Sequence, residues 1–337
     1  MSLATPSLAP SPLQAQPSRR VRRIALLIIG KYGTLIALAI MMLYFSLASK
    51  NTAFLQPNNL LNIVNQSTLT AIIASGLTIV SVAGELDLSV GYNASLAAVL
   101  VTGLIANQGL PLALAILLTI AVGALVGVTN GVLVTKVRIN AVVATLGVGT
   151  ILVGLSFGYT AGTPIISLPK AFTGLTLRSF LGLPLPIWYM VVILAVLWVA
   201  LNRTQLGQRM QASGANRSAA RLAGVRVERA QTAAFVIAGV CAAITGILLA
   251  SVLGSGTVSS ADGYLLDAFA AVFLGSATLR DGDFHIVGTL IGVLIVNVGF
   301  NGLGILGTPT FYQFVFKGGI LIFAVALSTI ARKYAKD

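Results

Sequence analysis

The chain has 337 residues, of which 57% are hydrophobic and only 9% are charged, and its mean hydropathy is +0.96. A soluble domain of this length would need a largely apolar surface, so the composition excludes that class and indicates an integral membrane protein. The formal net charge of +13 does not indicate nucleic-acid binding, because the basic residues are scattered over short loops and form no groove interleaved with aromatic residues.

Residues 1–30 are predicted to form a disordered, basic cytoplasmic tail. The first 18 residues are rich in Ala, Ser and Pro, a composition typical of disorder. Ser18-Arg19-Arg20 superficially resembles a twin-arginine export signal. However, the apolar region that follows runs beyond Ser46 without a convincing cleavage site, and many more apolar runs come after it. A retained basic anchor is therefore preferred over a cleaved signal.

Ten apolar runs follow, and each is long enough to cross about 30 Å of hydrocarbon as a helix. None has the alternating pattern of a barrel strand. Residues 31–333 are therefore predicted to form an all-α, polytopic transmembrane helical bundle of about 10 spans. We place the spans at 32–49, 60–83, 88–106, 112–135, 141–160, 186–202, 231–253, 264–279, 286–305 and 311–331.

The basic residues predict the orientation of the bundle. With the N-terminus inside, the cytoplasmic segments hold seventeen Lys and Arg residues, whereas the outer segments hold only Lys50, Lys170 and Arg178. Positive charge accumulates on the cytoplasmic side of membrane proteins, and an odd number of spans would place Arg332 and Lys333 outside. Both termini are therefore predicted to be cytoplasmic.

Two glycine-flanked polar breaks interrupt the apolar rhythm. Glu85 and Asp87 lie between the second and third spans, and Asp262 and Asp267 lie at the entrance of the eighth. The sequences around Asp87 and Asp267 are similar, which hints at an inverted repeat with broken helices. Polar breaks in corresponding halves of a chain indicate a transport pathway. The candidate gate or broken-helix residues are Glu85, Asp87, Ser89, Gly91, Tyr264 and Asp267.

Simpler roles compete with a gate at these positions. In a hydrated loop, Glu85 and Asp87 would cap the third span, and this interpretation is preferred over direct contact with a solute. Asp267 lies within a span, where an uncompensated charge costs roughly 2.5 to 3.5 kcal/mol. It should therefore face a pore, a partner or the nearby interface.

Uncharged polar residues within the spans are candidates for a solute pathway, because amides can hydrogen-bond the hydroxyl groups of a solute. They are Asn65, Gln66, Asn93, Asn130, Asn297 and Asn301. Such amides also join helices to one another, and for any single one this interpretation is preferred. His285 has no neighbouring ligand residues and is predicted to be an ordinary solvated or interfacial histidine. Because Cys241 is the single cysteine, no metal site is predicted.

The longest internal segment, residues 203–230, is predicted to be a cytoplasmic loop that contains one short helix. Asn216 is a suitable N-cap, Ala220 and Leu222 favour a helix, and Gly224 is a suitable stop. Such an exposed helix is either a surface feature or a peg that docks into a soluble partner.

These patterns together resemble the permeases of ribose-, xylose- and galactoside-type ABC importers. That family's Gly-x-Asn-x-x-Ala-Ala-Arg-Leu-x-Gly segment, which contacts the ATPase, matches residues 214–224, and its Asp-Leu-Ser-Val-Gly motif matches residues 87–91. The resemblance continues through residues 139–147 and 288–292 and covers the chain from about Lys31. It implies ATPase-coupling roles for Gly214, Asn216, Arg217, Ala220, Arg221, Leu222 and Gly224.

Two features depart from the family pattern. Glu85 stands where an apolar residue is more common, and residues 275–283 replace a glycine-rich turn after the eighth span. Both lie on the predicted cytoplasmic side, so they bear on the ATPase contact or the gate rather than on the family.

The resemblance implies a permease subunit, in the bacterial cytoplasmic (inner) membrane, of an ATP-driven importer for a monosaccharide or related polyol. No GxxxxGK[ST] phosphate loop occurs, so the chain is predicted not to be an enzyme, and ATP hydrolysis is expected in a separate subunit. The implied partners are an ABC ATPase, a periplasmic or extracellular sugar-binding protein, a second permease chain in a homodimer or heterodimer, and membrane lipid. No cofactor is expected in this chain.

A self-sufficient secondary transporter driven by protons or sodium is the alternative. It would need titratable groups near the middle of the membrane, and Asp267 is the only acidic candidate within a span. A membrane enzyme would need an activated nucleophile or a cluster of His, Asp and Glu residues, which the sequence lacks.

Overall fold

The computed structural model describes residues 19–277 and 282–334. These residues form thirteen α-helices, one 3-10 helix and one small hairpin. The α-helices are α1 Arg19–Ala48, α2 Pro57–Val82, α3 Val90–Ala106, α4 Leu112–Thr135, α5 Ala141–Thr160, α6 Lys170–Leu177, α7 Leu185–Arg203, α8 Gln205–Ala215, α9 Arg217–Leu222, α10 Val227–Leu253, α11 Gly263–Ser276, α12 Ile286–Ile305 and α13 Phe311–Tyr334. The 3-10 helix η1 covers Lys50–Leu55, and β1 (Ser179–Phe180) pairs antiparallel with β2 (Leu183–Pro184). The fold is therefore all-α apart from this hairpin.

Ten of these helices coincide with the ten predicted spans. Six of them, α2, α4, α5, α7, α10 and α12, are long and apolar enough to cross a membrane, whereas the apolar stretches of α1, α3, α11 and α13 are shorter. α4, α5 and α12 begin and end at the predicted residues. α11 ends at Ser276, and residues 278–279 of its predicted span lie outside the described part of the chain.

The start of α1 corrects the predicted tail. The helix begins at Arg19, so residues 19–30 are helical, although the sequence predicted disorder up to residue 30. The apolar run at 24–29 consists of Ile, Ala and Leu, which continue the helix of the first span toward the N-terminus. The predicted disorder of residues 1–18 concerns a part of the chain that the structure does not describe.

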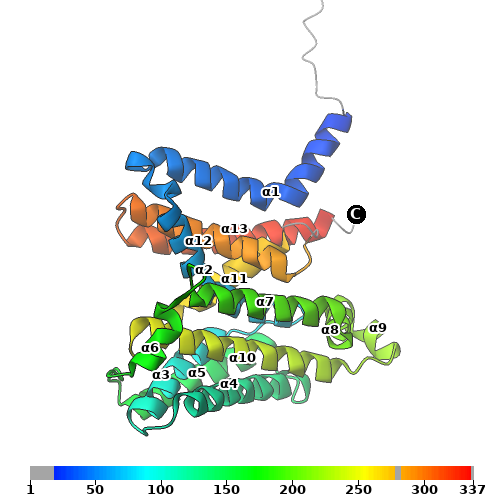
Figure 1. Cartoon of the computed structure of the whole chain (residues 1–337). Helices are drawn as coiled ribbons and strands as arrows, with labels where there is room; N and C mark the ends of the chain where they lie inside the picture. The colour runs from blue at the N-terminus through cyan, green and yellow to red at the C-terminus, as the bar shows by residue number, and fades with distance from the viewer. Residues whose placement is uncertain (1–18, 278–281, 335–337) are drawn as a thin grey trace, which may run out of the picture.

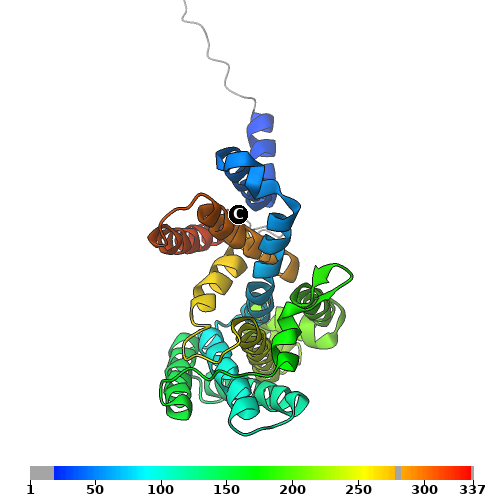
Figure 2. The ribbon, with the colours of Figure 1, turned by 60° about the vertical axis from the view of Figure 1, so that its left-hand side comes forward.

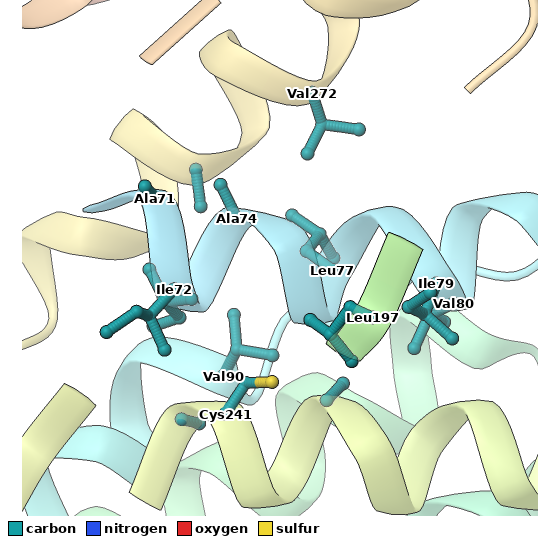
Figure 3. Packing of buried hydrophobic residues seen from close by; sticks show 14 of the residues in the cluster. Ala71, Ile72, Ala74, Leu77, Ile79, Val80, Val90, Leu197, Cys241 and Val272 are labelled. Atoms are coloured by element: carbon teal, nitrogen blue, oxygen red, sulfur yellow. The ribbon is translucent and has the colours of Figure 1, made fainter. Parts of the chain in front are cut away.

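α2 is the central helix of the bundle. It packs against α7, α10, α11 and α12, and Figure 3 shows it between α10, which carries Cys241, and α11, which carries Val272. Ile72, Leu77 and Val80 of α2 are fully buried in the largest apolar cluster. Because every residue of α2 from Ser67 to Ser81 is buried, this part of the helix depends on the helices that surround it.

The other long helices form two groups on either side of α2 (Figures 1 and 2). On one side, α3 and α4 pack with α10, and α5 packs against α3 and α4. On the other side, α12 and α13 pack with α11, and α1 packs against α12. α7 packs against α2 and leads into α8 and α9 at one end of the bundle.

α4 and α10 approach each other through small residues. A Cβ atom at Gly127 would collide with the carbonyl oxygen of Phe235, and one at Gly131 would lie 2.7 Å from the methyl carbon of Thr232. Small residues spaced four apart let the backbones of membrane helices come close. The α4–α10 contact is therefore determined by backbone proximity rather than by large side chains.

Three short elements were not predicted from the sequence: η1, the segment of α6 with the hairpin, and α8. None has the long apolar run by which the spans were found. α6 and the hairpin form the connection between α5 and α7, where β2 leads directly into α7.

Candidate coupling and gating site

Two short helices occupy the segment between α7 and α10, where the cytoplasmic loop was predicted (Figure 1). The hydroxyl of Thr204 caps α8 by accepting a hydrogen bond from the amide of Gly207 at 3.2 Å. The side chain of Asn216 caps α9 by accepting one from the amide of Ala219 at 3.0 Å. Gly224 follows α9 with φ of +81°, a backbone conformation that favours glycine. The predicted helix, its N-cap and its stop are therefore confirmed.

α9 presents an apolar side chain to its surroundings. Leu222 is 91% exposed, whereas Ala220 is buried against the rest of the chain. Arg221 forms an ion pair with Glu228 at 2.7 Å, and both side chains are about half exposed, so the pair contributes little stability. Because Leu222 lies outside the apolar spans, its exposure leaves it accessible to a soluble partner rather than to lipid.

The end of α8 rests directly on the linker between α2 and α3. A side chain at Gly214 would collide with the carbonyl oxygen of Val82, and the Cα atom of Gly214 lies 3.0 Å from the position of a Cβ atom on Gly84. Gly84 has φ of +83°, so only glycine fits this position without strain. The backbones of the two segments are therefore in contact here.

Arg217 and Glu85 connect the same two segments by charge. One guanidinium nitrogen of Arg217 lies 2.5 Å from Oε1 of Glu85 and donates to the carbonyl of Gly84 at 3.1 Å. Gln231 of α10 donates to the same Glu85 oxygen at 3.2 Å and to the carbonyl of Ala83 at 3.2 Å. Burial raises the pKa of Glu85, and the positive charge of Arg217 opposes that shift. Glu85, the residue that departs from the family pattern, thus receives hydrogen bonds from both α9 and α10.

Asp87 and Ser89 form a buried polar cluster with Asn130 of α4. Oδ1 of Asp87 accepts hydrogen bonds from the amide of Ser89 at 2.8 Å and from its hydroxyl at 2.6 Å. The amide group of Asn130 donates to the hydroxyl oxygen of Ser89 at 2.7 Å. The hydroxyl of Thr145 on α5 accepts from the amide of Leu88 at 3.0 Å. The linker is therefore held by α4 and α5 as well as by α9.

The interpretation of Glu85 and Asp87 as helix caps is wrong. α3 begins after Ser89, and no side chain makes a capping hydrogen bond at its start. Asp87 is 1% exposed rather than hydrated, because its carboxylate turns back onto Ser89 instead of reaching the first amides of α3. Glu85 is occupied by Arg217 and Gln231.

The second break lies beside the first half of α3. The hydroxyl of Ser95 donates to Oδ1 of Asp262 at 2.6 Å and accepts from the amide of Ala261 at 2.9 Å. A Cβ atom at Gly91 would lie 3.1 Å from that of Leu265 and 3.2 Å from the carbonyl oxygen of Asp262. Through Gly91 and Ser95, α3 therefore joins the first break to the start of α11.

Asp267 lies within α11 and has a cationic neighbour. Nζ of Lys317 on α13 is 2.8 Å from Oδ1 of Asp267. Tyr264 stands one turn earlier on the same helix. The echo between Asp87 and Asp267 does not correspond to equivalent positions, because Asp87 lies in a linker before a helix and Asp267 lies inside one. The sequence signal for this pairing was that Asp267 and Lys317 are residues of opposite charge within predicted spans.

The amides that were candidates for a pathway lie in different surroundings. Asn93 donates to the carbonyls of Gly123 and Gly239, at 3.4 and 3.3 Å, and so connects α3, α4 and α10. Asn301 exchanges two hydrogen bonds of 3.0 Å with Asn59 of α2. Asn297 donates to the carbonyl of Val293 in its own helix, and Asn130 belongs to the Asp87 cluster. Within the described residues, Asn65 has a buried oxygen without a hydrogen-bond partner, and Gln66 is exposed.

His285 is neither solvated nor interfacial as predicted. It is 5% exposed, and its Nδ1 accepts a hydrogen bond of 2.7 Å from the amide of Gly288. His285 thus caps α12, because a side-chain acceptor at the N-cap satisfies an amide that has no partner within the helix.

Comparison with known proteins identifies the family to which the chain belongs. A family model described as "Branched-chain amino acid transport system / permease component" matches residues 59–325. The ribose import permease protein RbsC of Bacillus subtilis (strain 168) is 40% identical over 89% of this chain and 93% of that protein. The chain belongs to this family of ABC transporter permease components. The L-arabinose ABC transporter permease protein AraH of Azospirillum brasilense is 34% identical over 96% of this chain and 95% of its own length. No solved structure matches the chain.

Membership of the ABC permease family confirms the resemblance that the sequence motifs indicated. As an ABC permease component, the chain is a multi-pass protein of the bacterial inner membrane. It is not catalytic itself, because the ATPase is a separate subunit, and a solute-binding protein belongs to the same kind of system. The family works without a cofactor, and the described residues contain no group of three His, Cys, Asp or Glu side chains that could hold a metal ion.

Residues 278–281, which belong to the predicted departure from the glycine-rich turn, lie outside the described part of this permease component.

Ser95, Gln231 and Thr145 were not predicted as site residues. Each is an uncharged polar residue within a mainly apolar helix, and only the packing of distant segments identifies its partner.

Proposed function

We propose that the chain is the permease subunit of an ATP-driven importer for a monosaccharide or related polyol. The names of the chain's relatives support this class of solute. Proteins that are 34 to 40% identical to the chain over about nine-tenths of both lengths are named as ribose and L-arabinose permeases. The amide side chains of Asn65, Gln66 and Asn297 suit such a solute, because they can donate to and accept from hydroxyl groups.

The proposed orientation has ten membrane crossings with both termini in the cytoplasm. Six long apolar helices and four shorter apolar stretches supply ten candidates for the crossings. The seventeen-to-three distribution of basic residues supports this orientation. It puts α8 and α9 on the side where ATP is available.

In the assembled transporter, α9 would dock into the ATPase. Leu222 would enter an apolar pocket of the ATPase, and Arg217 and Arg221 would border it, since a buried apolar anchor with a charged rim is a common form of protein interface. Gly214, Asn216, Ala220 and Gly224 would maintain the shape and seating of the helix. A second permease chain, identical or different, and surrounding lipid complete the proposed assembly.

Movement of α8 and α9 would reach the gate through a contiguous set of contacts. Arg217 is bound to Glu85, the linker continues to the Asp87 cluster, and Ser95 of α3 is bound to Asp262 before α11. Glu85, Asp87, Ser89, Gly91, Tyr264 and Asp267 would thus form one gate, with α3 and α11 as its moving parts. A physical link of this kind is necessary for coupling, and its function has to be tested by mutation.

An ion-coupled transporter is the weaker candidate. Asp267, its only acidic candidate within a span, is already paired with Lys317. A carboxylate held by a buried ammonium group has less freedom to bind and release a transported cation.

Reconstitution tests the proposed function. The tagged chain is used to capture its ATPase and binding protein from membranes, the sugar that the binding protein binds is identified, and the purified complex is placed in liposomes. We expect uptake of that sugar to require ATP and the binding protein. Accumulation by the permease alone under a proton or sodium gradient would establish the alternative, and capture of a binding protein specific for amino acids would overturn the solute class.

A further inference from the structure

A groove of about 480 Å³ lies on the flank of the bundle between α4 and α7. α10 and α6 also contribute residues to its lining. The residues that line it include Ile116 and Ile120 of α4, Val192 and Ile193 of α7, Ile247 of α10 and Leu175 of α6. Its volume is within the range of about 300 to 1,000 Å³ typical of ligand pockets, yet its lining is almost wholly apolar.

The groove occupies one half of the thickness of the bundle. Its α7 residues lie within about three turns of Leu185, where α7 begins, and its α10 residues lie within about three turns of Leu253, where α10 ends. Three turns span about 16 Å, roughly half of the 30 Å hydrocarbon core. In the orientation proposed above, on which the choice of leaflet rests, this is the outer half.

Two cations flank α6, the helix whose Leu175 lines the groove. α6 has Lys170 as its first residue and Arg178 directly after its last, and both are exposed. The carbonyl of Arg178 accepts a hydrogen bond of 3.0 Å from the amide of Leu185, which places it beside the start of α7. No Asp or Glu occurs between Asp87 and Glu228, so no acidic residue of this segment neutralises the two cations.

Trp188 lies between the apolar groove and its charged end. Its ring lines the groove, and its indole N–H donates to the carbonyl of Phe180 in the hairpin at 3.1 Å. Tryptophan is enriched where hydrocarbon meets headgroups, because it has an apolar ring and one polar group. The groove therefore begins at headgroup level and extends into the hydrocarbon.

We propose that this groove binds an acyl chain of an anionic phospholipid of the outer leaflet, whose phosphate is held by Arg178. An acyl chain matches the apolar lining and the position of the groove within the spans. A sugar would leave its hydroxyl groups there without hydrogen-bond partners, which is costly. The guanidinium of Arg178 can bind a phosphate with two parallel hydrogen bonds, and Lys170 at the other end of α6 adds to the positive charge of the outer segment.

Lipid retention by the purified, delipidated complex tests the proposal. Native mass spectrometry compares binding of phosphatidylglycerol and of phosphatidylcholine with the same acyl chains. Ile193→Trp fills the groove, and Arg178→Glu reverses the charge at its end. Val196→Trp, at an exposed position on the same helix outside the groove, and Lys136→Glu, at an exposed cation on the predicted cytoplasmic side, are the matched controls.

We expect the unmodified complex to retain phosphatidylglycerol in preference to phosphatidylcholine. Ile193→Trp should abolish retention, Arg178→Glu should weaken phosphatidylglycerol binding about tenfold, and both controls should behave like the unmodified complex. Val192→Trp, at the exposed rim, repeats the filling test if Ile193→Trp does not fold. Uptake is not measured, so a failed importer assignment would leave this result intact.

Three results would overturn the proposal. Equal retention of the two lipids, or no effect of Arg178→Glu, would exclude the anionic headgroup. Unchanged retention in a folded groove-filling variant would exclude the groove. Crosslinking of Val192→Cys to a second permease chain in the intact complex would make the groove a contact between subunits.

Discussion

Lys317 and Asp267 carry opposite charges on neighbouring helices, and each lowers the cost of burying the other. Their side chains are only 18% and 12% exposed, and the Lys317 ammonium also donates to the carbonyl of Gly263 at 3.3 Å and lies 5.4 Å from the ring centre of Phe300. Either charge alone within a span would cost roughly 2.5 to 3.5 kcal/mol. The pair therefore connects α13 to the short helix α11 at a place where neither residue is readily replaced alone.

Removing only the cation should destabilise the permease. Lys317→Met leaves Asp267 buried without its partner, and we expect a loss of about 3 kcal/mol. The double variant Lys317→Met with Asp267→Asn should recover most of that loss, because no buried charge remains. Thermal unfolding in detergent measures both. If the single variant is as stable as the unmodified chain, the pair does not stabilise α11.

The Glu85–Arg217 contact should affect coupling more than stability. Glu85→Gln and Arg217→Gln should each lower the sugar transported per ATP hydrolysed, by up to about fivefold for a contribution of about 1 kcal/mol. The double variant should be no worse than either single one, because both remove the same interaction. Additive losses in the double variant would show that the two residues act independently.

The pH dependence of coupling follows from the same pair. Burial raises the pKa of Glu85 in the folded chain, so Glu85 takes up a proton at a higher pH than an ordinary glutamate does. As the pH falls through that raised pKa, the ion pair is lost and coupling should decline. Glu85→Gln should remove this part of the pH profile, and an unchanged profile would contradict the assignment to Glu85.

Local chemistry determined which residue roles could be predicted. The capping by Asn216 and the stop at Gly224 were predictable, because both depend on neighbours within a few residues. The partners of Asp87 were not, because Asn130 reaches it from another helix. His285 was misjudged for a related reason: its burial depends on how the start of α12 packs, which one sequence does not show.

At the scale of elements, long apolar runs were predictable and short polar elements were not. α4, α5 and α12 could be delimited to the residue, because a membrane span needs a sustained run of apolar residues. α6 and α8 are only eight and eleven residues long and contain polar residues. Helices this short are marginal in isolation and depend on packing against their neighbours, which the sequence pattern does not encode.

The contact between α4 and α10 gives a prediction at this scale. Gly127→Ala places a methyl group against the carbonyl oxygen of Phe235, so we expect a loss of about 1 to 3 kcal/mol in stability. Gly147→Ala on α5 is the matched control, because no atom lies within 4 Å of its added Cβ and alanine favours a helix. Comparable thermal unfolding of the two variants would argue against close α4–α10 packing.

For the whole molecule, the distribution of charge predicts which end of the bundle faces the cytoplasm. Ser218 in α9 and Ser179 in the hairpin are both exposed, and they lie on opposite sides in the proposed orientation. Cys241 is buried at 3% exposure, so it should not react with a membrane-impermeant thiol reagent. Each serine can therefore be replaced by cysteine and labelled separately.

Ser179→Cys should react in intact cells, whereas Ser218→Cys should react only after the membrane is opened. The measurement is the fraction of each variant labelled before and after permeabilisation. Reaction of Ser218→Cys in intact cells would place α9 outside the cell. The proposed docking of α9 on an ATPase would then be wrong.

The backbone contact between Gly84 and Gly214 should limit how the permease can respond to its ATPase. Where two backbones touch, no side chain is available to rotate and absorb a small displacement. A shift of α8 by even part of an ångström must then be followed by the main chain ahead of α3. The earliest response to ATP should therefore be a change in backbone position at residues 83–89, visible as altered amide hydrogen exchange before any change in the exposed ends of the bundle.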